Sequence, residues 1–386
     1  MTETFPSNTF APTPATDALD DAIDRAIAEN RIVGTVVMLA EDGEVVYARA
    51  AGMADREAGR EMQPGTWFRY ASVSKPFTTV AALRLIADGR LSPDDAVEKW
   101  LPDMVLHDSD GNPVTITVGH LLSHMAGLDY GFNQPADGAY ANAGVSDGIS
   151  EREISLGENI RRIATVPVDL TPGRDWRYSV ATDVLGAVIE AVTGTALPVA
   201  MANLVTDPLS LDAAYYMQGT ANLATNYADG PDGPERMVGV TYVRGQLPEG
   251  QAFAFDPDRI TDLAAFPSGG GGMAGTAPAA LALLETLRHG DFLPDELRAE
   301  AAKNRISVPH PMRGEGVGHA WAGAVYIDPD RAGVALSPGS LSWGGIYGHC
   351  WFIDPARRRT LIALTNTAIE GMAGDFALDM AEAIAR

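Results

Sequence analysis

Pro76 fixes where a helix can begin within residues 69–80, which read Arg-Tyr-Ala-Ser-Val-Ser-Lys-Pro-Phe-Thr-Thr-Val. Because proline has no N–H and is tolerated only in the first turn of a helix, the helix is predicted to start near Ser72. Residues three apart share a helix face, so the hydroxyl of Ser72 and the amine of Lys75 are expected to lie side by side. The sequence therefore predicts a serine and a lysine paired at a helix N-terminus.

Such a pair can turn the serine into a nucleophile. A serine hydroxyl reacts poorly until a neighbouring base takes its proton, and an adjacent amine can take it. The free N–H groups and positive potential of a helix N-terminus also favour an alkoxide. Ser74 is the weaker candidate, because a residue adjacent to Lys75 faces another side of the helix. The chain's only lysines are Lys75, Lys99 and Lys303. Because a chance Ser-x-x-Lys match is rarer in a chain with so few lysines, the motif indicates an acyl-transfer serine more strongly here than in a lysine-rich chain.

Charge and length limit the other functions of the chain. Its 386 residues are enough for two domains, or for one large domain with a sizeable insertion. The formal net charge of −23 argues against nucleic acid and anionic membrane surfaces as partners, because both need a basic footprint. No apolar run approaches the ~20 residues of a membrane-spanning helix. We therefore expect neither nucleic acid nor a membrane as a partner.

Cysteine and histidine usage bears on location and cofactors. The single cysteine, Cys350, rules out an internal disulfide and fits a reducing compartment. Residues 1–16 are polar and lack the charged-then-apolar pattern of a signal peptide. The histidines are scattered without a His-Glu-x-x-His arrangement, so no metal site is predicted. We expect a cytoplasmic protein that uses no metal ion or cofactor.

Apolar patterning predicts strands at both ends of the chain and helices between them. The β-branched runs 33–39 and 44–50 are joined by Asp42-Gly43, which is a hairpin signal. Further strands are expected at 321–327, 347–353 and 360–366, and helices at 17–30, 72–87, 92–101, 118–124, 157–165, 180–193, 276–289 and 372–385. Residues 129–156 are expected to form a loop, and 220–266 have no pattern that we can interpret.

This order of elements predicts an α+β fold in which one antiparallel sheet is built from both termini and a helical region is inserted. We place the α/β sheet domain at 1–72 and 266–386, and the mainly helical domain at 73–265.

A rival nucleophile motif, Gly-x-Ser-x-Gly, surrounds Ser146 at residues 144–148. In an α/β-hydrolase this motif needs a buried strand before it and a helix after it. Here it follows Ala-Tyr-Ala-Asn-Ala at 139–143, which contains no β-branched residue, inside the expected loop. We therefore interpret Ser146 as a residue without a catalytic role.

The Ser-x-x-Lys chemistry needs two further parts, a second group for proton transfer and donors for the developing oxyanion. Tyr178, at a loop-to-helix junction, is a candidate for the first, because a phenol near a lysine cation ionises more easily. Taken alone, a tyrosine beside Trp176 is more often a packed aromatic. Gly344 and Gly345, ahead of a strand, allow a substrate to approach the backbone closely. On their own, however, these two glycines would be interpreted as an ordinary turn between strands. The glycine-rich stretch 268–275 is expected to be a turn that packs near the site.

Taken together, these residues resemble the serine β-lactamase-like superfamily, and most closely its family VIII carboxylesterases, which are related to class C β-lactamases. The matching stretches are Tyr70-Ala-Ser72-Val-Ser-Lys75-Pro-Phe-Thr, Leu121-Leu-Ser-His-Met-Ala-Gly-Leu128, Tyr178-Ser-Val-Ala-Thr-Asp-Val-Leu-Gly186 and Trp343-Gly-Gly-Ile-Tyr-Gly348. Gly269 to Thr276 and Phe352-Ile-Asp-Pro355 stand in the expected order, so the similarity spans about residues 15–385.

The resemblance implies an antiparallel sheet flanked by helices, an inserted helical domain, and an active site in the cleft between them. By residue match, Ser72 is the nucleophile and Lys75 shares its proton, while Tyr178 acts as general base and later protonates the leaving group. The backbone N–H groups of Ser72 and Ile346 would form the oxyanion hole. The match leaves open whether Lys75 or Tyr178 takes the first proton, because groups this close titrate as a unit.

Two departures from the β-lactamase pattern bear on the substrate. The Lys-Thr-Gly triplet is here Trp-Gly-Gly at 343–345, which removes a cation suited to a carboxylate. The Tyr-x-Asn pattern is here Tyr-Ser-Val at 178–180, which removes an amide. Without both groups a site loses its means of holding an acylamido carboxylate. Trp343 and Val180 instead favour an apolar, uncharged substrate.

We therefore expect a serine esterase that acts on small or short-chain carboxylic esters, with Tyr130, Trp343, Gly344 and Gly345 in contact with the substrate. The expected partner is a small-molecule ester, and the oligomeric state stays open. One alternative is an amide-cleaving enzyme on the same scaffold, such as a β-lactamase, a D-amino-acid peptidase or an amide-oligomer hydrolase. The other is a non-catalytic binding protein, against which the intact Ser-Lys-Tyr set argues.

Overall fold

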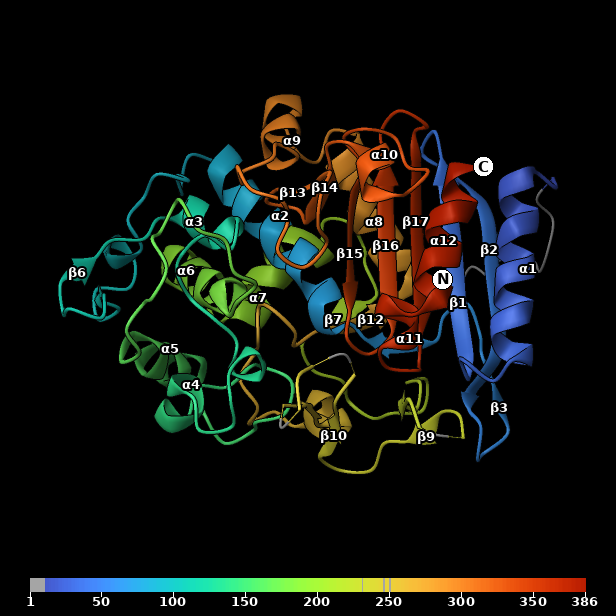
Figure 1. Cartoon of the computed structure of the whole chain (residues 1–386), viewed down its shortest axis with the longest axis horizontal. Coiled ribbons are helices and arrows are strands. Elements are labelled where there is room, and N and C mark those ends of the chain that lie inside the picture. The colour runs from blue at the N-terminus through green and yellow to red at the C-terminus, as the bar shows by residue number, and fades with distance from the viewer. Residues whose placement is uncertain (1–10, 231, 246, 250) are drawn as a thin grey trace.

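An eight-stranded antiparallel sheet forms the centre of the computed structural model, which describes residues 11–386 except 231, 246 and 250 (Figure 1). Its strand order is β13-β14-β15-β16-β17-β1-β2-β3. The bounds are Gly34–Glu41 (β1), Glu44–Asp55 (β2), Arg60–Glu61 (β3), Val317–His319 (β13), Ala324–Tyr326 (β14), Leu341–Gly345 (β15), His349–Asp354 (β16) and Arg359–Thr365 (β17). The predicted α+β fold class, with an antiparallel sheet flanked by helices, is confirmed.

Strands from the two ends of the chain lie side by side in the middle of this sheet. β1 pairs with β17 from Thr35 opposite Thr365 onward, and with β2 on its other edge. The β1–β2 turn is Asp42-Gly43, with φ of 54° and 91°, the positive values that a tight two-residue hairpin requires. The hairpin predicted from Asp-Gly is therefore present, and the sheet draws on both termini as expected.

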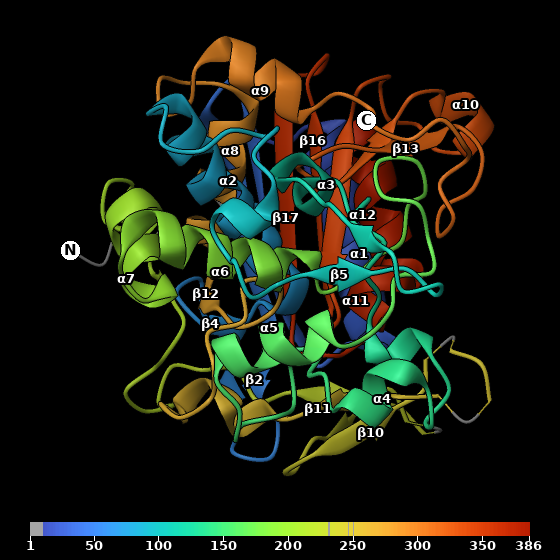
Figure 2. The ribbon, with the colours of Figure 1, turned by 90° about the vertical axis from the view of Figure 1, so that its left-hand side faces the viewer.

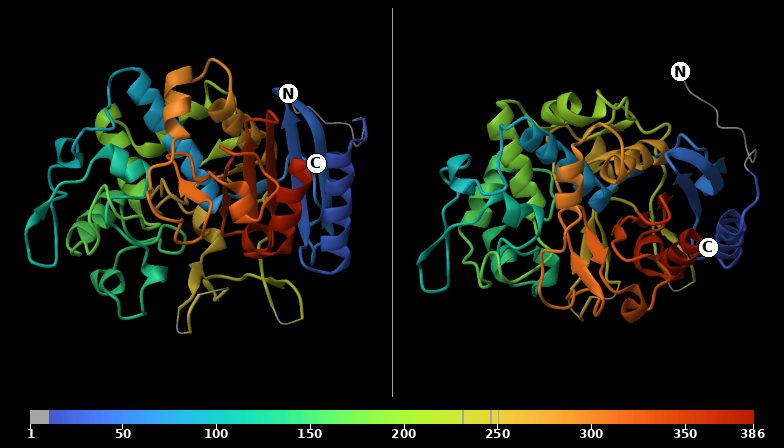
Figure 3. Two further views of the ribbon diagram at one scale, coloured as in Figure 1. Left: turned by 45° about the horizontal axis from the view of Figure 1, so that its top comes forward. Right: turned by 90° about the horizontal axis from the view of Figure 1, so that it is seen from above.

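Helices cover both faces of the sheet (Figure 3). On one face α12 packs on β16 and β17 and against α1, while α8 packs on β1 and β17 from the other face and contacts α2. The helix bounds are Pro14–Ala28 (α1), Ser74–Ala87 (α2), Val118–Leu122 (α3), Ala139–Ala143 (α4), Leu156–Ala164 (α5), Ala181–Thr193 (α6), Leu197–Met201 (α7), Ala277–Arg288 (α8), Asp295–Ala301 (α9), Pro329–Ala332 (α10), Glu370–Ala373 (α11) and Asp375–Ala385 (α12).

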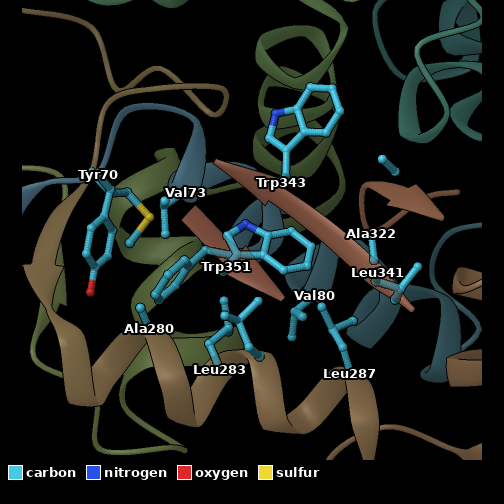
Figure 4. Close-up of a cluster of buried hydrophobic side chains, with 14 of the residues drawn as sticks. Tyr70, Val73, Val80, Ala280, Leu283, Leu287, Ala322, Leu341, Trp343 and Trp351 are labelled. Atoms are coloured by element: carbon cyan, nitrogen blue, oxygen red, sulfur yellow. The ribbon is translucent and has the colours of Figure 1, made fainter. Parts of the chain in front are cut away.

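The core between the sheet and α8 is built around Trp351 of β16, whose side chain is fully buried. Leu283 and Leu287 of α8 lie on the side of that helix that faces Trp351, and Val80 of α2 lies beside them (Figure 4). Burial of one large apolar side chain contributes roughly 1.5–3 kcal/mol. This packing fixes α2, and therefore the turn that precedes it, against the sheet.

The helices α3, α5, α6 and α7 gather on one side of the sheet, with α2 between them and the strands (Figure 2). α6 packs on α2, α3, α5 and α7, and is almost wholly buried. Short strands link the regions: Trp67–Arg69 (β4), Leu106–His107 (β5), Pro113–Val114 (β6), Ala213–Ala214 (β7), Tyr227–Ala228 (β8), Glu235–Arg236 (β9), Thr241–Val243 (β10), Phe253–Phe255 (β11) and Ala274–Thr276 (β12).

Residues 220–266, which the sequence left without an interpretation, run along one end of the sheet as two short hairpins, β8–β9 and β10–β11 (Figure 1). The backbone N–H of Tyr227 donates to the carbonyl of Asn366, 2.8 Å away, which ties this segment to the end of β17. The two-domain division at 73 and 266 stays a prediction.

Two predictions of secondary structure are wrong. Residues 92–101 form only a 3-10 turn at Val97–Lys99, because the Asp95 side chain accepts hydrogen bonds from the Ser92 N–H and the Trp100 indole, which compete with helical bonding. The expected loop 129–156 contains α4 and a 3-10 turn at Gly131–Asn133.

Among the described residues, no single helix is long and apolar enough to cross a membrane, and one sharply bent pair, 181–193 with 197–206, passes that test by length and composition alone.

Candidate active site

Ser72 lies in a 3-10 turn, Ala71–Val73, that runs directly into α2. Ala71 before it has a φ of 45°, a left-handed value that costs a non-glycine residue roughly 1–3 kcal/mol. Strand β4, which precedes the turn, is paired with β12, so the chain enters the turn from a fixed direction. The helix starts where Pro76 predicted, with the Ser72 hydroxyl at its N-terminus.

Ser72, Lys75 and Tyr178 form one hydrogen-bonded group. The Ser72 Oγ lies 2.6 Å from the Tyr178 phenolic oxygen, and the Lys75 Nζ donates to the same Oγ over 3.2 Å. Tyr178 lies just before α6, which packs on α2 and so holds the phenol over the serine. Side chains separated by 106 positions in the chain therefore meet as the sequence predicted.

Lys75 is almost wholly buried and its ammonium donates in three directions. Besides Ser72, it donates to the Tyr130 phenol over 2.9 Å and to the Gly270 carbonyl over 2.8 Å. Burial raises the pKa of Tyr130 well above its usual value, so this phenol stays protonated. All three acceptors are neutral oxygens, so no carboxylate accepts a hydrogen bond from the Lys75 amine among the described residues.

Tyr178 is held in place by aromatic neighbours. Its ring lies about 5 Å from those of Tyr130, His124 and Trp343, with centroid distances of 5.1, 5.0 and 5.1 Å. The Trp343 Nε1–H donates to the Tyr178 oxygen over 3.3 Å, and the Lys75 ammonium lies 4.7 Å from the Tyr178 ring centroid. A cation and an N–H donor therefore both lie beside the Tyr178 side chain.

Two backbone N–H groups, those of Ser72 and Ile346, border the site without an acceptor among the described residues. Ile346 follows the last residue of β15 and lines the same cavity as Ser72. Gly345 brings this strand end close to the serine turn, because a Cβ there would lie 2.4 Å from the Tyr70 carbonyl oxygen. An oxyanion hole requires two such N–H donors beside one space, and both residues line the same cavity.

A cavity of about 390 Å³ opens in front of Ser72. Among the expected contact residues, Tyr130, Trp343 and Gly344 line it, and aromatic and aliphatic side chains supply most of the remaining wall. Gly345 does not line the cavity, because its α-carbon lies against the backbone of Tyr70. Val180 is fully buried beneath the site rather than exposed in it. Neither Gly345 nor Val180 therefore forms part of the cavity wall, and the predicted substrate contact of Gly345 stays a prediction.

The stretch 220–266 contributes to the cavity as well, through Leu247 and Phe253, and Phe253 packs on Phe132 with centroids 4.8 Å apart. The glycine-rich turn 268–275 packs at the site as predicted, since the Gly270 carbonyl accepts from Lys75 and Gly271 lines the cavity.

Two acids that the sequence did not single out support the site, the half-buried Asp147 and the fully buried Asp183. Asp147 accepts from the N–H groups of Gly131 and Phe132 over 2.6 and 3.1 Å, and burial raises its pKa to about 7. Asp183 on α6 accepts weakly from the Gly270 N–H over 3.4 Å, and burial raises its pKa too, although Lys75 opposes that shift. The former orders the wall next to Tyr130, and the latter orders the turn that receives Lys75.

Sequence reasoning also missed Arg313 and a set of buried histidines beside Trp343. The His310 Nε2 lies 3.2 Å from the His319 Nδ1, and the centroid of the His319 ring lies 5.6 Å from that of the His124 ring. Burial lowers the pKa of all three, so they are neutral. His124 stands in a stretch that carried the resemblance, which is a usable signal, whereas no local pattern marks Arg313. The described residues contain no group of three or more His, Cys, Asp or Glu arranged to hold a metal ion.

Ser146, the rival serine, is fully buried and lies in no strand-to-helix elbow. Its hydroxyl donates to Glu151 over 2.6 Å and accepts from the Gly148 N–H over 3.0 Å, so it closes a loop. It does not line the cavity that contains Ser72.

Comparison with known proteins agrees with this geometry. Esterase EstB of Burkholderia gladioli is 43% identical over 95% of this chain and 94% of that protein. The structure of EstCE1, a hydrolase with promiscuous acyltransferase activity, matches 97% of this chain and 99% of its own with a TM-score of 0.94 and 40% identity. The simvastatin synthase LovD of Aspergillus terreus, 21% identical with a TM-score of 0.72 over 97% of this chain and 98% of its own, shares the fold.

The Beta-lactamase family model matches residues 19–383, which is nearly the whole chain. That span includes both sheet segments, the inserted helices and each member of the Ser72, Lys75 and Tyr178 group. The protein therefore belongs to the Beta-lactamase family.

Proposed function

We propose that this protein is a serine carboxylesterase that hydrolyses small or short-chain esters through an acyl-enzyme on Ser72, and that it groups with the family VIII esterases. The observation that carries the proposal is the hydrogen-bonded set of Ser72, Tyr178 and Lys75 at an apolar cavity. Its identity of 43% with an esterase over almost the full length of both chains supports ester cleavage.

In the proposed mechanism, the Ser72 hydroxyl attacks the ester carbonyl as Tyr178, 2.6 Å away, accepts its proton. Tyr178 starts this step as the phenolate, which the Lys75 ammonium and the Trp343 indole N–H stabilise, and it becomes a neutral phenol when it takes the Ser72 proton. The N–H groups of Ser72 and Ile346 stabilise the oxyanion of the tetrahedral intermediate. Tyr178 then returns the proton to the departing alcohol, and water releases the acid by the same sequence in reverse.

The cavity favours esters over β-lactams and peptide amides. By the sequence match, Trp343 takes the place of the β-lactamase lysine and Val180 that of the asparagine, and the Val180 side chain is fully buried. A site without hydrogen-bond partners for an acylamido group rejects substrates that must bury it. Ester cleavage also has an alkoxide leaving group, which needs less proton assistance than an amine.

A second candidate activity is transfer of the acyl group from Ser72 to an added alcohol. The aromatic and aliphatic wall of the cavity, including Phe132 and Phe253, favours an organic alcohol over water near the acyl-enzyme. Formation of butyl butyrate from vinyl butyrate and 1-butanol would measure it, and free butyrate as the sole product would rule it out.

The test of the proposed function is hydrolysis of p-nitrophenyl butyrate beside a chromogenic cephalosporin. The wild type should cleave the ester, Ser72→Ala should lose at least about a thousandfold in kcat, and Ser146→Ala should keep its rate. Fast opening of the cephalosporin ring with slow ester cleavage would favour the amide-cleaving alternative. Ester cleavage that persists in Ser72→Ala would overturn the assignment of the nucleophile.

We also propose a cytoplasmic location, which is supported by the buried free thiol of Cys350 as the chain's single cysteine. Cell fractionation with an antibody against the chain would test it, and recovery in the secreted fraction would contradict it.

A further inference from the structure

Arg313 brings a guanidinium to the wall of the cavity that Trp343 forms. The Arg313 Cζ lies 5.0 Å from the centroid of the Trp343 ring, a cation–π contact. Its Nη1 donates to the Ser342 hydroxyl over 3.1 Å and to the Tyr326 phenol over 3.3 Å. Strands β14 and β15 thus hold one edge of the guanidinium, while the residue itself is exposed and lines the cavity.

The rest of the guanidinium is free to bind a ligand. A guanidinium has five N–H donors in a planar fork that matches a carboxylate, and both hydrogen bonds observed here come from Nη1. Among the described residues, no carboxylate forms an ion pair with Arg313, although the chain has 51 acidic and 28 basic residues. An arginine left without an acid in so acidic a chain, at a cavity, is placed to receive an anion from solution.

Arg313 is also at a useful position relative to the reacting atoms. The indole on which it stacks donates to the Tyr178 oxygen over 3.3 Å, and that oxygen is 2.6 Å from the Ser72 Oγ. The guanidinium and the nucleophile therefore line one cavity, and contacts through the Trp343 and Tyr178 side chains connect them. The other charged residue of the cavity wall is Asp147, which belongs to the wall near Tyr130 rather than to the Trp343 wall.

The histidines behind Trp343 do not compete for the anion. Burial, and then the charge of Arg313, lowers the pKa of His310 to about 3, and the pKa of His319 is lowered well below its usual value for the same reasons among others. Both rings stay neutral at physiological pH, so Arg313 is the cation of this wall within the described part of the chain.

We propose that Arg313 binds a carboxylate on the substrate, so that the preferred substrates are short esters with one carboxylate on either the acyl or the alcohol part. This inference rests on the proposed esterase function and deepens it. Trp343 and Val180 led the sequence to predict an uncharged substrate, and Arg313, which that prediction did not consider, supplies a cation on the Trp343 wall.

The test compares matched charged and neutral esters at low ionic strength. For the acyl part the pair is mono-4-nitrophenyl glutarate and 4-nitrophenyl methyl glutarate, and for the alcohol part it is 4-acetoxybenzoate and methyl 4-acetoxybenzoate. In one of the two pairs the charged ester should have about a tenfold higher kcat/KM, mainly through KM, as expected of one charge-assisted hydrogen bond at an exposed site. The pair that shows the preference assigns the carboxylate to the acyl or the alcohol part.

Arg313→Met should bring that ratio close to one, and Arg313→Lys should leave an intermediate ratio because it keeps the charge without the planar fork. Arg331→Gln, an exposed arginine outside the cavity, is the matched control and should keep the wild-type ratio. Equal kcat/KM for both members of both pairs would overturn the inference, as would an Arg313→Met variant with an unchanged ratio. A wrong esterase assignment can be told apart from a wrong role for Arg313. In the first case Ser72→Ala would cleave the neutral esters as fast as the wild type, or neither would cleave them; in the second case only the charge preference would be missing.

Discussion

Asp147 shows how one half-buried residue in the cavity wall couples the cavity to pH. Its two carboxylate oxygens accept from the N–H groups of Gly131 and Phe132, which position the wall beside Tyr130. Burial raises its pKa from 3.8 to about 7, so the folded protein holds this proton more tightly than the unfolded chain. Stability from this group is complete below about pH 4 and is lost as pH rises toward 7.

Asp147→Asn should therefore become more stable relative to the wild type as pH rises from about 4 to 8. The gain should approach about 4 kcal/mol, on top of a constant cost for losing one acceptor. Urea unfolding at several pH values measures it, with Asp137→Asn, exposed on the same loop, as the control. A difference between variant and wild type that does not change with pH would contradict the raised pKa.

At the level of single residues, the sequence predicted the parts of the site that chemistry constrains locally. Ser72 and Lys75 are fixed by helix spacing and by Pro76, and both meet Tyr178 in the structure. Arg313 could not be found in this way, because the residues that hold it, Ser342 and Tyr326, lie 29 and 13 positions away. Contacts between residues this far apart in the chain produce no periodic pattern in the amino-acid sequence.

Among the secondary-structure elements, β15 is the one that completes the site. Its two terminal glycines were expected to admit the substrate, but a Cβ on Gly345 would lie 2.4 Å from the Tyr70 carbonyl oxygen. The strand end therefore packs directly on the turn that carries Ser72, and the N–H of Ile346 is positioned by that packing. A single glycine thus sets the distance between Ser72 and the N–H of Ile346, which we propose as the second oxyanion donor.

Gly345→Ala should lower kcat for p-nitrophenyl butyrate by about a hundredfold, because moving a catalytic group by ~1 Å has an effect of that size. It should also cost roughly 1–3 kcal/mol in the free energy of unfolding, through overpacking. Gly157→Ala on α5, where a Cβ would meet nothing within 4 Å, is the matched control and should keep its activity. A Gly345→Ala enzyme with the wild-type kcat would refute the positioning role of β15.

Element by element, the sequence predicted long or strongly patterned segments better than short ones. β1, β2 and β17 are apolar runs of seven residues or more and were recognised. β13 is three residues long and β15 ends in Gly-Gly, so neither has an alternation that a pattern could reveal. The hairpins within 220–266 have strands of only two or three residues, so the sequence pattern did not predict them either.

On the scale of the whole molecule, the fold depends on the two ends of the chain meeting. α12, the last helix, packs on α1, the first, and on the central strands β16 and β17. Its side chains Phe376, Met380 and Ile384 form one stripe and are fully buried. The active site is built on strands that this contact closes, so helix packing far from Ser72 should control whether the site exists at all.

Met380→Ala should destabilise the whole protein by about 2–5 kcal/mol, the usual cost of deleting a large buried side chain. Loss of esterase activity on heating should coincide with loss of helical circular dichroism, at a lower temperature than in the wild type. Leu378→Ala, on the same helix but 61% exposed, should differ little from the wild type. Activity that is lost well before the helical signal would show that the site unfolds separately.

The assignment of Ser72 as the nucleophile is tested most directly by the site of covalent labelling by a fluorophosphonate, read by mass spectrometry of the digested protein. We expect a single adduct on the peptide that contains Ser72, absent from Ser72→Ala and formed much more slowly in Tyr178→Phe, which lacks the proton acceptor. An adduct on Ser146, or no adduct under conditions in which p-nitrophenyl butyrate is hydrolysed, would contradict it.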